Sequence, residues 1–301
     1  MIRKSSSVIA AAVFAVEAIR RAGLRHTAPI EISGTVDEES GGFAGVGWLA
    51  EHKWISREKT KAVIIPEPFG IDRVCIGHRG VYWFEVTAEG RIAHGSMPYL
   101  GVNAVEGMSH LLDLVRDELS PALYQRVTAM PVVPAGSRHA TININGIDGG
   151  QPVDGVPTPC VADRCRVVFD RRFLLEEGLE NTRAEVAALV AKAQARMPEV
   201  TFTITDRLIF EPTRAPEDAP LIGALTDAIA QVTGRQAALV ASPGTYDQKH
   251  VARIGHLHDC IAYGPGILDL AHRPDEWVGI DDMVQSAQVM ARGLDRLLKG
   301  E

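Results

Sequence analysis

The order of strand-like and helical segments between residues 78 and 210 limits most strongly what this chain can fold into. An alternating strand, "GVYWFEVTAEG", precedes the helical run "GVNAVEGMSHLLDLVRDEL". Two strands, a helix and a last strand follow: "HATININGI", "CVADRCRVVFDRRF", "TRAEVAALVAKAQARM" and "EVTFTITDRLIFEP". The order β-α-β-β-α-β is that of a ferredoxin-like layer. It predicts an independent α+β domain over residues 78–210, inserted into a second domain.

The flanking residues alternate between helix and strand. Before the insertion come a helix with apolar residues from Val8 to Ile19, a strand Ile30–Val36, the helical run "FAGVGWLAEH" and the apolar strand "KAVIIPEP". After it come the helical "APLIGALTDAIAQVTGR", the strand "DCIAYGPG" and a closing helix Ile280–Lys299. This rhythm predicts an α/β domain with a mostly parallel sheet, built from residues 1–77 and 211–301.

Charge and cysteine content narrow the class of protein. The formal net charge of -7 argues against nucleic acid or an anionic membrane as a partner. The four cysteines form no CxxC pair, which favours free thiols in a reducing compartment. The basic, apolar start loosely resembles a signal peptide, but Glu17 interrupts the apolar run. We therefore expect a cytoplasmic protein that begins with a core helix.

Polar residues follow three of the predicted strands of the outer domain. Asp37, Glu38 and Glu39 come after the first strand, Glu67 follows the second, and His272 follows the strand near the C-terminus. Open parallel sheets bind ligands outside the carboxyl ends of their strands. Carboxylate oxygens and imidazole nitrogens are ligands of zinc and similar ions. These residues are therefore predicted to converge on one crevice.

Each of these residues also has an ordinary explanation. Acidic side chains suit a solvated helix N-terminus, Glu67 can be a loop residue beside prolines, and His272 can be a surface histidine. Taken one at a time, the ordinary explanations are favoured. Their shared position at strand ends and their matched chemistry favour a site when they are taken together.

Several spaced segments resemble motifs of the M20 metallopeptidases, in particular enzymes of the acetylornithine deacetylase and succinyl-diaminopimelate desuccinylase type. The segments are "TVDEESGG", "IIPEP", "GRIAHGSMPYLGVNAV", "INGIDGGQPVDGVPTPC" and "YGPG" followed by "LAHRPDE". They occur in the family's order over nearly the whole chain. The resemblance implies a zinc-peptidase-like catalytic domain interrupted by a ferredoxin-like dimerisation domain, or lid.

The resemblance also implies roles in the catalytic domain. Glu38 matches the general base, Glu39 a metal ligand, Glu67 a ligand of a second metal, and His272 a ligand shared with the metal of Glu39. The family holds two Zn²⁺ or Co²⁺ ions per subunit. Metal coordination lowers the pKa of bound water to about 7 in favourable sites. A neighbouring carboxylate can then take the proton and pass it to the leaving nitrogen.

Three residues of the inserted domain match family positions. His94 matches a lid histidine that supports the oxyanion in the neighbouring subunit, Arg172 matches an arginine that binds a substrate carboxylate, and Asn103 matches a substrate-binding position. The ordinary alternative for Arg172 is a surface strand arginine. The resemblance implies a homodimer that hydrolyses the amide bond of N-acyl amino acids or small peptides.

The chain departs from the family pattern in two places. The family's H-x-D motif and its G-R-G-x-x-D segment, whose Asp bridges the metals, are absent and are expected to lie upstream of Met1. Asp154 stands where the family has an Asn near the substrate. Glu39 and His272 alone are expected to form at most one weak metal site. Two hypotheses follow: a metal-dependent amidohydrolase, or a catalytically incompetent truncated homolog that only dimerises or binds ligand.

Overall fold

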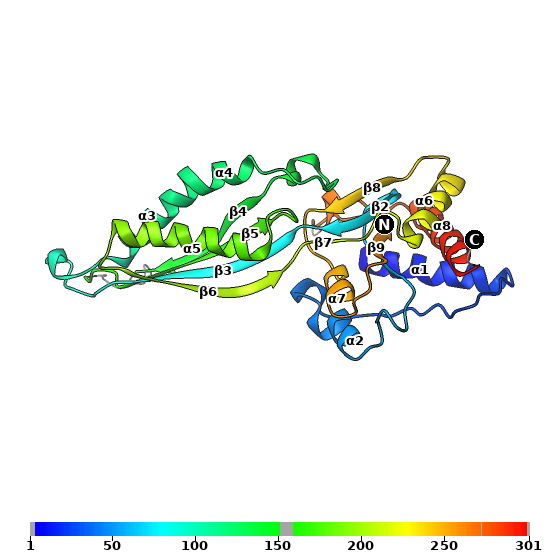
Figure 1. Ribbon diagram of the computed structural model, residues 1–301, viewed down its shortest axis with the longest axis horizontal. Coiled ribbons are helices and arrows are strands. Elements are labelled where there is room, and N and C mark those ends of the chain that lie inside the picture. The colour runs from blue at the N-terminus through cyan, green and yellow to red at the C-terminus, as the bar shows by residue number, and fades with distance from the viewer. Residues whose placement is uncertain (1–3, 151–158, 272, 300–301) are drawn as a thin grey trace. The chain divides into compact units, whose positions relative to one another are not determined.

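The chain divides into two compact units in a computed structural model that describes residues 4–150, 159–271 and 273–299 (Figure 1). Unit 1 comprises Met1–His78, Met130–Val133 and Thr213–Glu301, and unit 2 comprises Arg79–Ala129 and Pro134–Pro212. Unit 1 therefore contains both ends of the chain, and unit 2 is inserted into it in sequence.

Unit 2 is a four-stranded antiparallel sheet with helices packed on it. Its sheet has the order β4-β5-β3-β6, and all three pairings are antiparallel. In chain order its elements are β3 (Gly80–Glu89), η3 (Pro98–Leu100), α3 (Ala104–Leu114), η4 (Val115–Leu119), α4 (Ser120–Tyr124), η5 (Ala135–Arg138), β4 (Thr141–Gly149), β5 (Arg164–Phe173), α5 (Leu179–Arg196) and β6 (Thr201–Phe210). The β-α-β-β-α-β order predicted from the sequence is confirmed.

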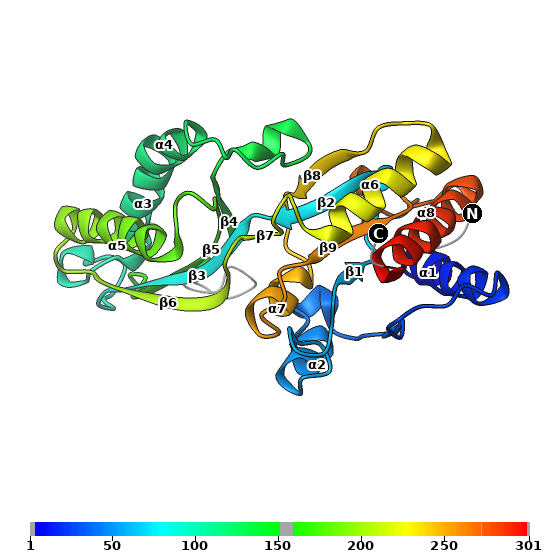
Figure 2. The same ribbon diagram turned by 45° about the vertical axis from the view of Figure 1, so that its right-hand side comes forward.

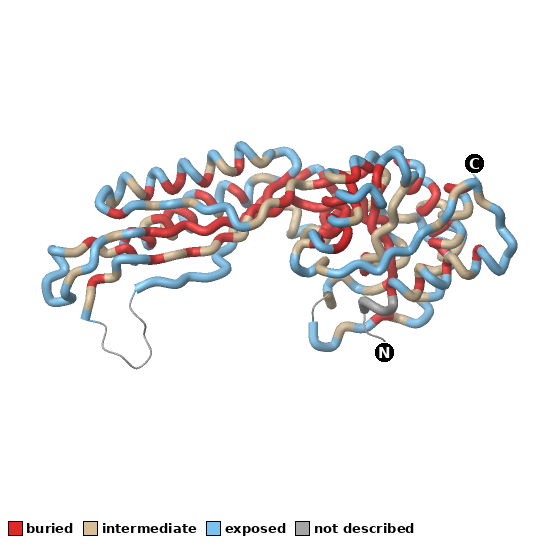
Figure 3. Tube along the Cα trace, turned by 90° about the horizontal axis from the view of Figure 1, so that it is seen from below, coloured by how far each residue is buried: buried red, intermediate tan, exposed pale blue. Residues whose placement is uncertain are grey.

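The core of unit 2 follows the two-residue period of its strands. Tyr82 and Phe84 of β3 and Phe169 of β5 point to one face of the sheet, where they pack with apolar residues of α3 and α5. Figure 3 shows buried residues along the inner segments of this unit. Glu85 and Thr87, which alternate with them along β3, belong to the other face and are polar. The sequence alternation thus sets which face of the sheet the helices cover.

Unit 1 is built on a mixed sheet of the order β1-β9-β2-β7, with β8 also paired to β2. β1 pairs with β9 and β2 with β8 in parallel, whereas β2 pairs with β9 and β7 in antiparallel fashion. The elements are α1 (Lys4–Arg21), η1 (Glu38–Ser40), η2 (Phe43–Gly47), α2 (Trp48–Glu51), β1 (Val63–Ile65), β2 (Gly70–His78), β7 (Thr213–Arg214), α6 (Pro220–Thr233), β8 (Ala238–Ser242), α7 (Gln248–Arg253), β9 (Cys260–Gly264), η6 (Leu268–Leu270) and α8 (Ile280–Lys299).

The two faces of this sheet carry different layers. Val74 and Ile76 of β2 and Ile261 of β9 share a core with apolar residues of α1, α6 and α8, which lie side by side in Figure 2. On the other face, Cys260 of β9 packs with Val251 of α7. The α/β class expected from the sequence is confirmed, although the sheet is mixed rather than mostly parallel, with two parallel and two antiparallel pairings. Across the described residues, no helix is both long and apolar enough to span a bilayer.

The prediction of a strand at Ile30–Val36 is wrong. These residues form no strand, and the side chains of Ile32 and Val36 are 46% and 66% exposed. A strand is stabilised by hydrogen bonds to a neighbour, and β1, the strand at this edge of the sheet, pairs only with β9 within the described ranges. With no strand to pair with, the apolar alternation of Ile30–Val36 does not produce one.

Candidate functional site

The acidic residues near the N-terminal part of unit 1 lie in a tight turn, the acidic loop, which comprises residues 37–42. Asp37 adopts a left-handed conformation with φ 70°, and its carbonyl accepts a 2.6 Å hydrogen bond from the Gly42 N–H. Its side-chain Oδ2 accepts a 3.1 Å hydrogen bond from the Ala44 N–H. Asp37 therefore shapes the turn, and Glu38 and Glu39 begin the short helix η1.

Helix α7 packs directly against this loop. The Nε2 atom of His250 donates a 2.7 Å hydrogen bond to the carbonyl of Gly41. Gly42 has φ 75°, and a Cβ atom there would lie 2.1 Å from Oδ1 of Asp247. Only glycine fits this left-handed position against the carboxylate. The second glycine of "ESGG" is thus explained by the close approach of α7.

Helix α7 carries a buried lysine. Lys249 is 2% exposed, and its Nζ is 3.6 Å from Oδ1 of Asp247. Burial lowers the pKa of Lys249, and the carboxylates of Asp247, Glu38 and Glu67 oppose that lowering. These three carboxylates therefore favour the charged form of this buried side chain, against the effect of burial.

The strand pairing explains how Glu67 reaches this position. β1 and β9 run parallel, so the residues that follow each strand emerge at the same edge of the sheet. A Cβ atom at Gly264, the last residue of β9, would lie 2.9 Å from the carbonyl oxygen of Glu67. The backbone after β1 is therefore packed against the end of β9, as expected for ligand sites at strand ends.

Neighbouring polar residues fix α7 to the sheet. Gln248 donates from Nε2 to the carbonyls of Ile76 and Cys260, at 3.2 and 2.6 Å, and its Oε1 accepts from Tyr246 at 2.7 Å. Burial raises the pKa of Asp247 and lowers that of His250. We did not predict this segment from the sequence, although "YDQKH" places four polar residues after a strand.

The described residues do not form a metal-binding group. Within residues 4–150, 159–271 and 273–299, no three side chains of His, Cys, Asp or Glu are arranged to hold an ion. Glu39 and Glu67 are described, and His272 lies outside the described residues, as does Asp154. The described side chains alone therefore do not form a metal site. The described part of the site contains a buried cationic side chain, Lys249.

In unit 2, His94 is held in a defined ring orientation. Its Nδ1 accepts a 3.1 Å hydrogen bond from the Ser96 N–H, and the Ser96 hydroxyl lies 2.8 Å from the same atom. Because Nδ1 accepts, the proton of the neutral ring is on Nε2. The exposed His94 side chain therefore presents an N–H donor to solvent.

The other two predicted residues of unit 2 already have partners. Asn103 is the N-cap of α3, and its Oδ1 accepts from the N–H groups of Val105 and Glu106 at 3.0 and 3.3 Å. Arg172 donates from Nε and Nη2 to both carboxylate oxygens of Asp170, at 2.7 and 2.9 Å. Capping explains Asn103 without a ligand, whereas Arg172 still has the N–H groups of Nη1 available.

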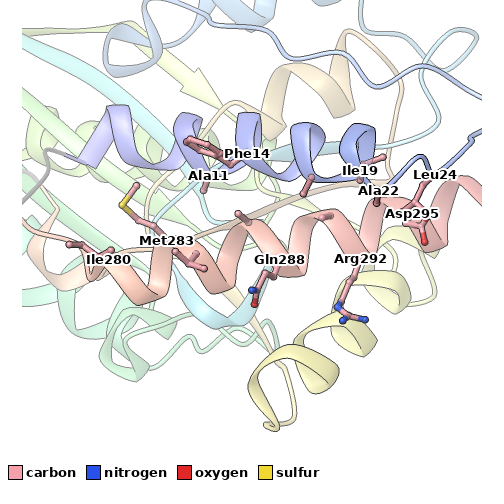
Figure 4. Close-up of a pocket in the computed structure, with 14 residues that line it drawn as sticks. Ala11, Phe14, Ile19, Ala22, Leu24, Ile280, Met283, Gln288, Arg292 and Asp295 are labelled. Carbon is pink, nitrogen blue, oxygen red and sulfur yellow. The ribbon is translucent and has the colours of Figure 1, made fainter.

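An apolar groove of about 710 Å³ lies between α1 and α8 in unit 1 (Figure 4). Phe14, Ile280 and Met283 line its apolar part, and Arg292 and Asp295 lie at its other end. Asp295 is 3.1 Å from Nε2 of His26 and accepts a 2.8 Å hydrogen bond from Lys299. The lining contains no residue of the acidic loop or of α7, so this groove is separate from the candidate site.

A family model described as peptidase family M20/M25/M40 matches residues 5–296. The chain belongs to this family. It is 29% identical over 279 residues to a succinyl-diaminopimelate desuccinylase of Psychrobacter sp. (strain PRwf-1), covering 91% of this chain and 65% of that protein. It is 25% identical over 280 residues to an acetylornithine deacetylase of Vibrio campbellii, covering 90% and 65%. This M20 chain thus spans about 65% of the length of these two relatives.

Solved structures of M20-type enzymes share the fold. Human carnosine dipeptidase 1 matches with a TM-score of 0.71 and 18% identity, over 96% of this chain and 70% of that one. The M20 metallo-carboxypeptidase Sso-CP2 from Sulfolobus solfataricus matches with a TM-score of 0.71 and 16% identity, over 97% and 76%. Membership in the family and the mixed α/β fold predicted from the motifs are confirmed, and the family is one of hydrolases of amide bonds.

Proposed function

We propose that this M20 chain is a metal-dependent amidohydrolase that deacylates N-acyl amino acids or small peptides. Relatives named as a desuccinylase and a deacetylase support this substrate class. The observation that carries the proposal is the packing of the acidic loop on α7, through the 2.7 Å hydrogen bond from His250 to Gly41, in a helix that also buries the charged residue Lys249. Glu38 and Glu67, 29 residues apart, both act on the pKa of Lys249, and perturbed ionisable groups of this kind cluster at active sites.

In this proposal Glu38 is the general base. Its carboxylate accepts a proton from the attacking water and passes it to the nitrogen of the leaving amine. The tight turn at Asp37 and the hydrogen bond from His250 of α7 to Gly41 hold the backbone on both sides of Glu38. A base held in this way loses little conformational freedom when substrate arrives.

Glu39, Glu67 and His272 are the proposed metal ligands, for Zn²⁺ or Co²⁺. Such an ion would polarise the scissile carbonyl and acidify a bound water. Full occupancy of two ions per subunit requires ligands beyond the described ones, since the described residues do not form a three-ligand group. We expect the 301-residue chain to bind metal weakly and to hydrolyse substrate slowly.

The proposed role of unit 2 is to supply the oxyanion donor and the carboxylate anchor. Nε2–H of His94 is oriented by the hydrogen bonds of Ser96 to Nδ1, so it can donate to a developing oxyanion. Arg172 can bind a substrate carboxylate through its outer N–H groups, and Asn103 keeps its amide NH₂ for substrate. In the family that the motifs resemble, the matching histidine acts at the site of a second subunit, so the proposed role of His94 requires a homodimer.

The two edges of the unit 2 sheet differ in a way that supports dimerisation. β6, at one edge, carries Asp206 and Arg207, and Asp206 is paired with Arg183. β4, at the other edge, has Asp148 as its one charged residue and exposes Ile144 and Ile147 at 43% and 60%. Charges usually protect edge strands from pairing, so β4 is the edge suited to a second copy.

Light scattering at micromolar concentration tests the homodimer. We expect a dimer for the wild-type protein and a monomer for Ile147→Lys, because a charge at the edge opposes strand pairing. Thr203→Lys on β6 is the matched control and should remain dimeric. A wild-type monomer would overturn the homodimer, and a dimeric Ile147→Lys protein would move the interface away from β4.

A cytoplasmic location is part of the same proposal. All four cysteines are free, and Cys75, Cys165 and Cys260 are buried, as expected in a reducing compartment. The second candidate function is a catalytically incompetent homolog that only dimerises or binds ligand. It is favoured by one observation, namely that no metal-binding trio forms among the side chains that the structure describes.

Adjacent substitutions at Glu38 and Glu39 separate the two functions. Hydrolysis of N-acetyl-L-ornithine and N-succinyl-diaminopimelate is followed at saturating zinc, together with the zinc content. Glu38→Ala should lower kcat about 10²–10⁴-fold with zinc binding unchanged, as expected for a lost general base. Glu39→Ala should lower both, and Glu31→Ala, outside the acidic loop, should lower neither. If the wild-type protein hydrolyses substrate no faster than Glu38→Ala does, the second candidate function, a homolog that only dimerises or binds ligand, is the correct one.

A further inference from the structure

We propose that His250 is a positioning residue that aims the acidic loop, with a catalytic meaning that rests on the proposed role of Glu38. His250 is distant in sequence from the loop, belongs to a six-residue helix, and donates its Nε2–H to the Gly41 carbonyl at 2.7 Å. No residue role implied by the family resemblance falls on His250. The inference therefore adds a residue of α7 to the machinery of the site.

The hydrogen bond acts at the point where the loop turns. Gly41 and Gly42 both have positive φ, at 119° and 75°, and the Gly42 N–H donates to the carbonyl of Asp37. A carbonyl at such a position can rotate easily because glycine has no Cβ to restrict it. Fixing the Gly41 carbonyl therefore limits the rotation that would swing Glu38 and Glu39 out of place.

The ring of His250 is itself held from several sides. It is 3% exposed, and its centroid lies 5.2 Å from that of Phe43 in an edge-to-face arrangement. A Cβ atom at Gly47 would lie 3.5 Å from its Nδ1. Because a carbonyl can only accept, Nε2 must carry the proton that is donated to Gly41. Packing and the hydrogen bond thus agree on one ring orientation.

Asp247 completes the clasp from the start of the same helix. The position that a Cβ atom of Gly42 would take lies 2.1 Å from Oδ1 of Asp247 and 3.2 Å from Cδ2 of His250. The backbone of the loop is therefore pressed against two polar side chains of α7. Lys249 lies between them in sequence and is coupled to Glu38. α7 consequently sets both the backbone and the charge surroundings of the proposed base.

Two substitutions separate the donated hydrogen bond from ring packing. His250→Phe keeps a buried ring beside Phe43 and removes the donor. His250→Gln loses the ring but places an N–H donor near the position of Nε2. If His250 positions the loop, the loop amides should stay protected from exchange in His250→Gln and lose protection in His250→Phe. If His250 is only a packing residue, the order should be reversed.

Hydrogen exchange measured by NMR is the readout, with Ser40, Gly41, Gly42 and Ala44 as the reporting amides. His250→Phe should raise their exchange rates about 5- to 10-fold, which corresponds to the loss of one hydrogen bond, and His250→Gln should raise them less than about 3-fold. Amides of β9 in the same unit and β5 in unit 2 are controls and should not change.

Unchanged loop exchange in His250→Phe would overturn the proposal. Equal acceleration in the loop and in β9 would also overturn it, since His250 would then be an ordinary core residue. The readout uses no substrate, so a chain that fails to hydrolyse amides still tests the positioning role. Hydrolysis assays then test the catalytic role separately. Faster loop exchange in His250→Phe with an unchanged kcat would show that the proposed role of Glu38 is wrong.

Discussion

Arg171 of unit 2 and Lys249 of unit 1 are both buried cations, and the two are held in different ways. In unit 2, the Arg171 side chain is 0% exposed and its Nη2 lies 2.5 Å from Oε1 of Glu177. In unit 1, Nζ of the buried Lys249 lies 3.6 Å from Oδ1 of Asp247. The first distance is that of a short charge-assisted hydrogen bond, and the second exceeds the usual length of one.

The pKa directions show which effect dominates in each unit. Burial acts to raise the pKa of Glu177, but Arg171 and Arg126 outweigh it, and the pKa is lowered. For Asp247 and Lys249 burial dominates, so the pKa of the acid is raised and that of the base is lowered. Pairing therefore outweighs desolvation in unit 2, and desolvation outweighs pairing in unit 1.

This difference separates a structural ion pair from a functional charge. Arg171 also donates to the carbonyl of Arg172, and Arg126 bridges Glu177 and Glu185, so the network in unit 2 is densely connected. A buried charge that its partners do not fully compensate destabilises the fold, and such groups cluster at functional sites. Burial dominates the pKa of Lys249, and its helix α7 is hydrogen-bonded to the acidic loop through His250.

The largest effect is expected where pairing dominates. Glu177→Gln leaves Arg171 buried without its main counter-charge and should lower the free energy of unfolding by about 3–5 kcal/mol. Urea unfolding followed by circular dichroism measures it. Asp117→Asn, at an exposed pair with Arg116, is the matched control and should have no measurable effect. A loss below about 1 kcal/mol for Glu177→Gln would remove the distinction between the units.

Acid should weaken unit 2 through the same residue. The folded pKa of Glu177 is lowered, so its contribution to stability is present above the ordinary glutamate pKa of 4.5 and is lost as the pH falls through the folded value. The stability difference between wild type and Glu177→Gln should therefore shrink below about pH 4.5. A difference that stays constant from pH 7 to pH 3 would contradict this assignment.

Arg172 offers a comparison with its neighbour Arg171 on the same strand. Its side chain is 23% exposed and pairs with Asp170, so Arg172→Ala should change stability by less than about 1 kcal/mol. It should nevertheless lower kcat/KM for substrates with a carboxylate, by an amount that corresponds to about 1.5–3 kcal/mol of activation free energy. Arg166→Ala, at a more exposed pair on β5, should leave kcat/KM unchanged. An equal effect of both would mean that Arg172 is not the anchor.

The buried cation of unit 1, Lys249, should contribute less to stability than the Arg171–Glu177 pair. Lys249→Met should cost less than about 2 kcal/mol at neutral pH, because burial already opposes the charge and Asp247 can take up a proton. With its folded pKa raised, Asp247 favours the folded state less as the pH rises, so the variant should be more stable at pH 5 than at pH 8. Urea unfolding at both pH values checks this, and the opposite order would contradict it.

The sequence predicted unit 2 better than unit 1 for a physical reason. In unit 2, β5 buries every second residue, and the sequence of β3, "GVYWFEVTAEG", alternates between apolar residues and polar or aromatic ones, so both strands can be recognised residue by residue. In unit 1, Gly70–His78 and Ala238–Ser242 form strands that were not predicted, and Ile30–Val36 alternates without forming one. Whether such a segment becomes a strand depends on a neighbour to pair with, which local periodicity does not report.

The candidate site was only partly accessible from the sequence for a similar reason. Glu38 and Glu67 could be proposed because they follow apolar segments and match family motifs. Lys249 and His250 could not, since α7 has six residues and no apolar periodicity to reveal that both are buried. Their importance comes from contacts across 200 residues of chain, as in the bond from His250 to Gly41.

The convergence of the acidic loop, Glu67 and α7 on one buried charge is the central claim, and the pKa of Lys249 tests it most directly. Heteronuclear NMR of the labelled Lys249 side chain gives that pKa in the wild type, in Glu38→Gln and in Glu67→Gln. We predict a wild-type value below 10.5 that each substitution lowers further, because both carboxylates stabilise the ammonium form. A value that neither substitution changes would show that the two acidic segments do not meet at Lys249.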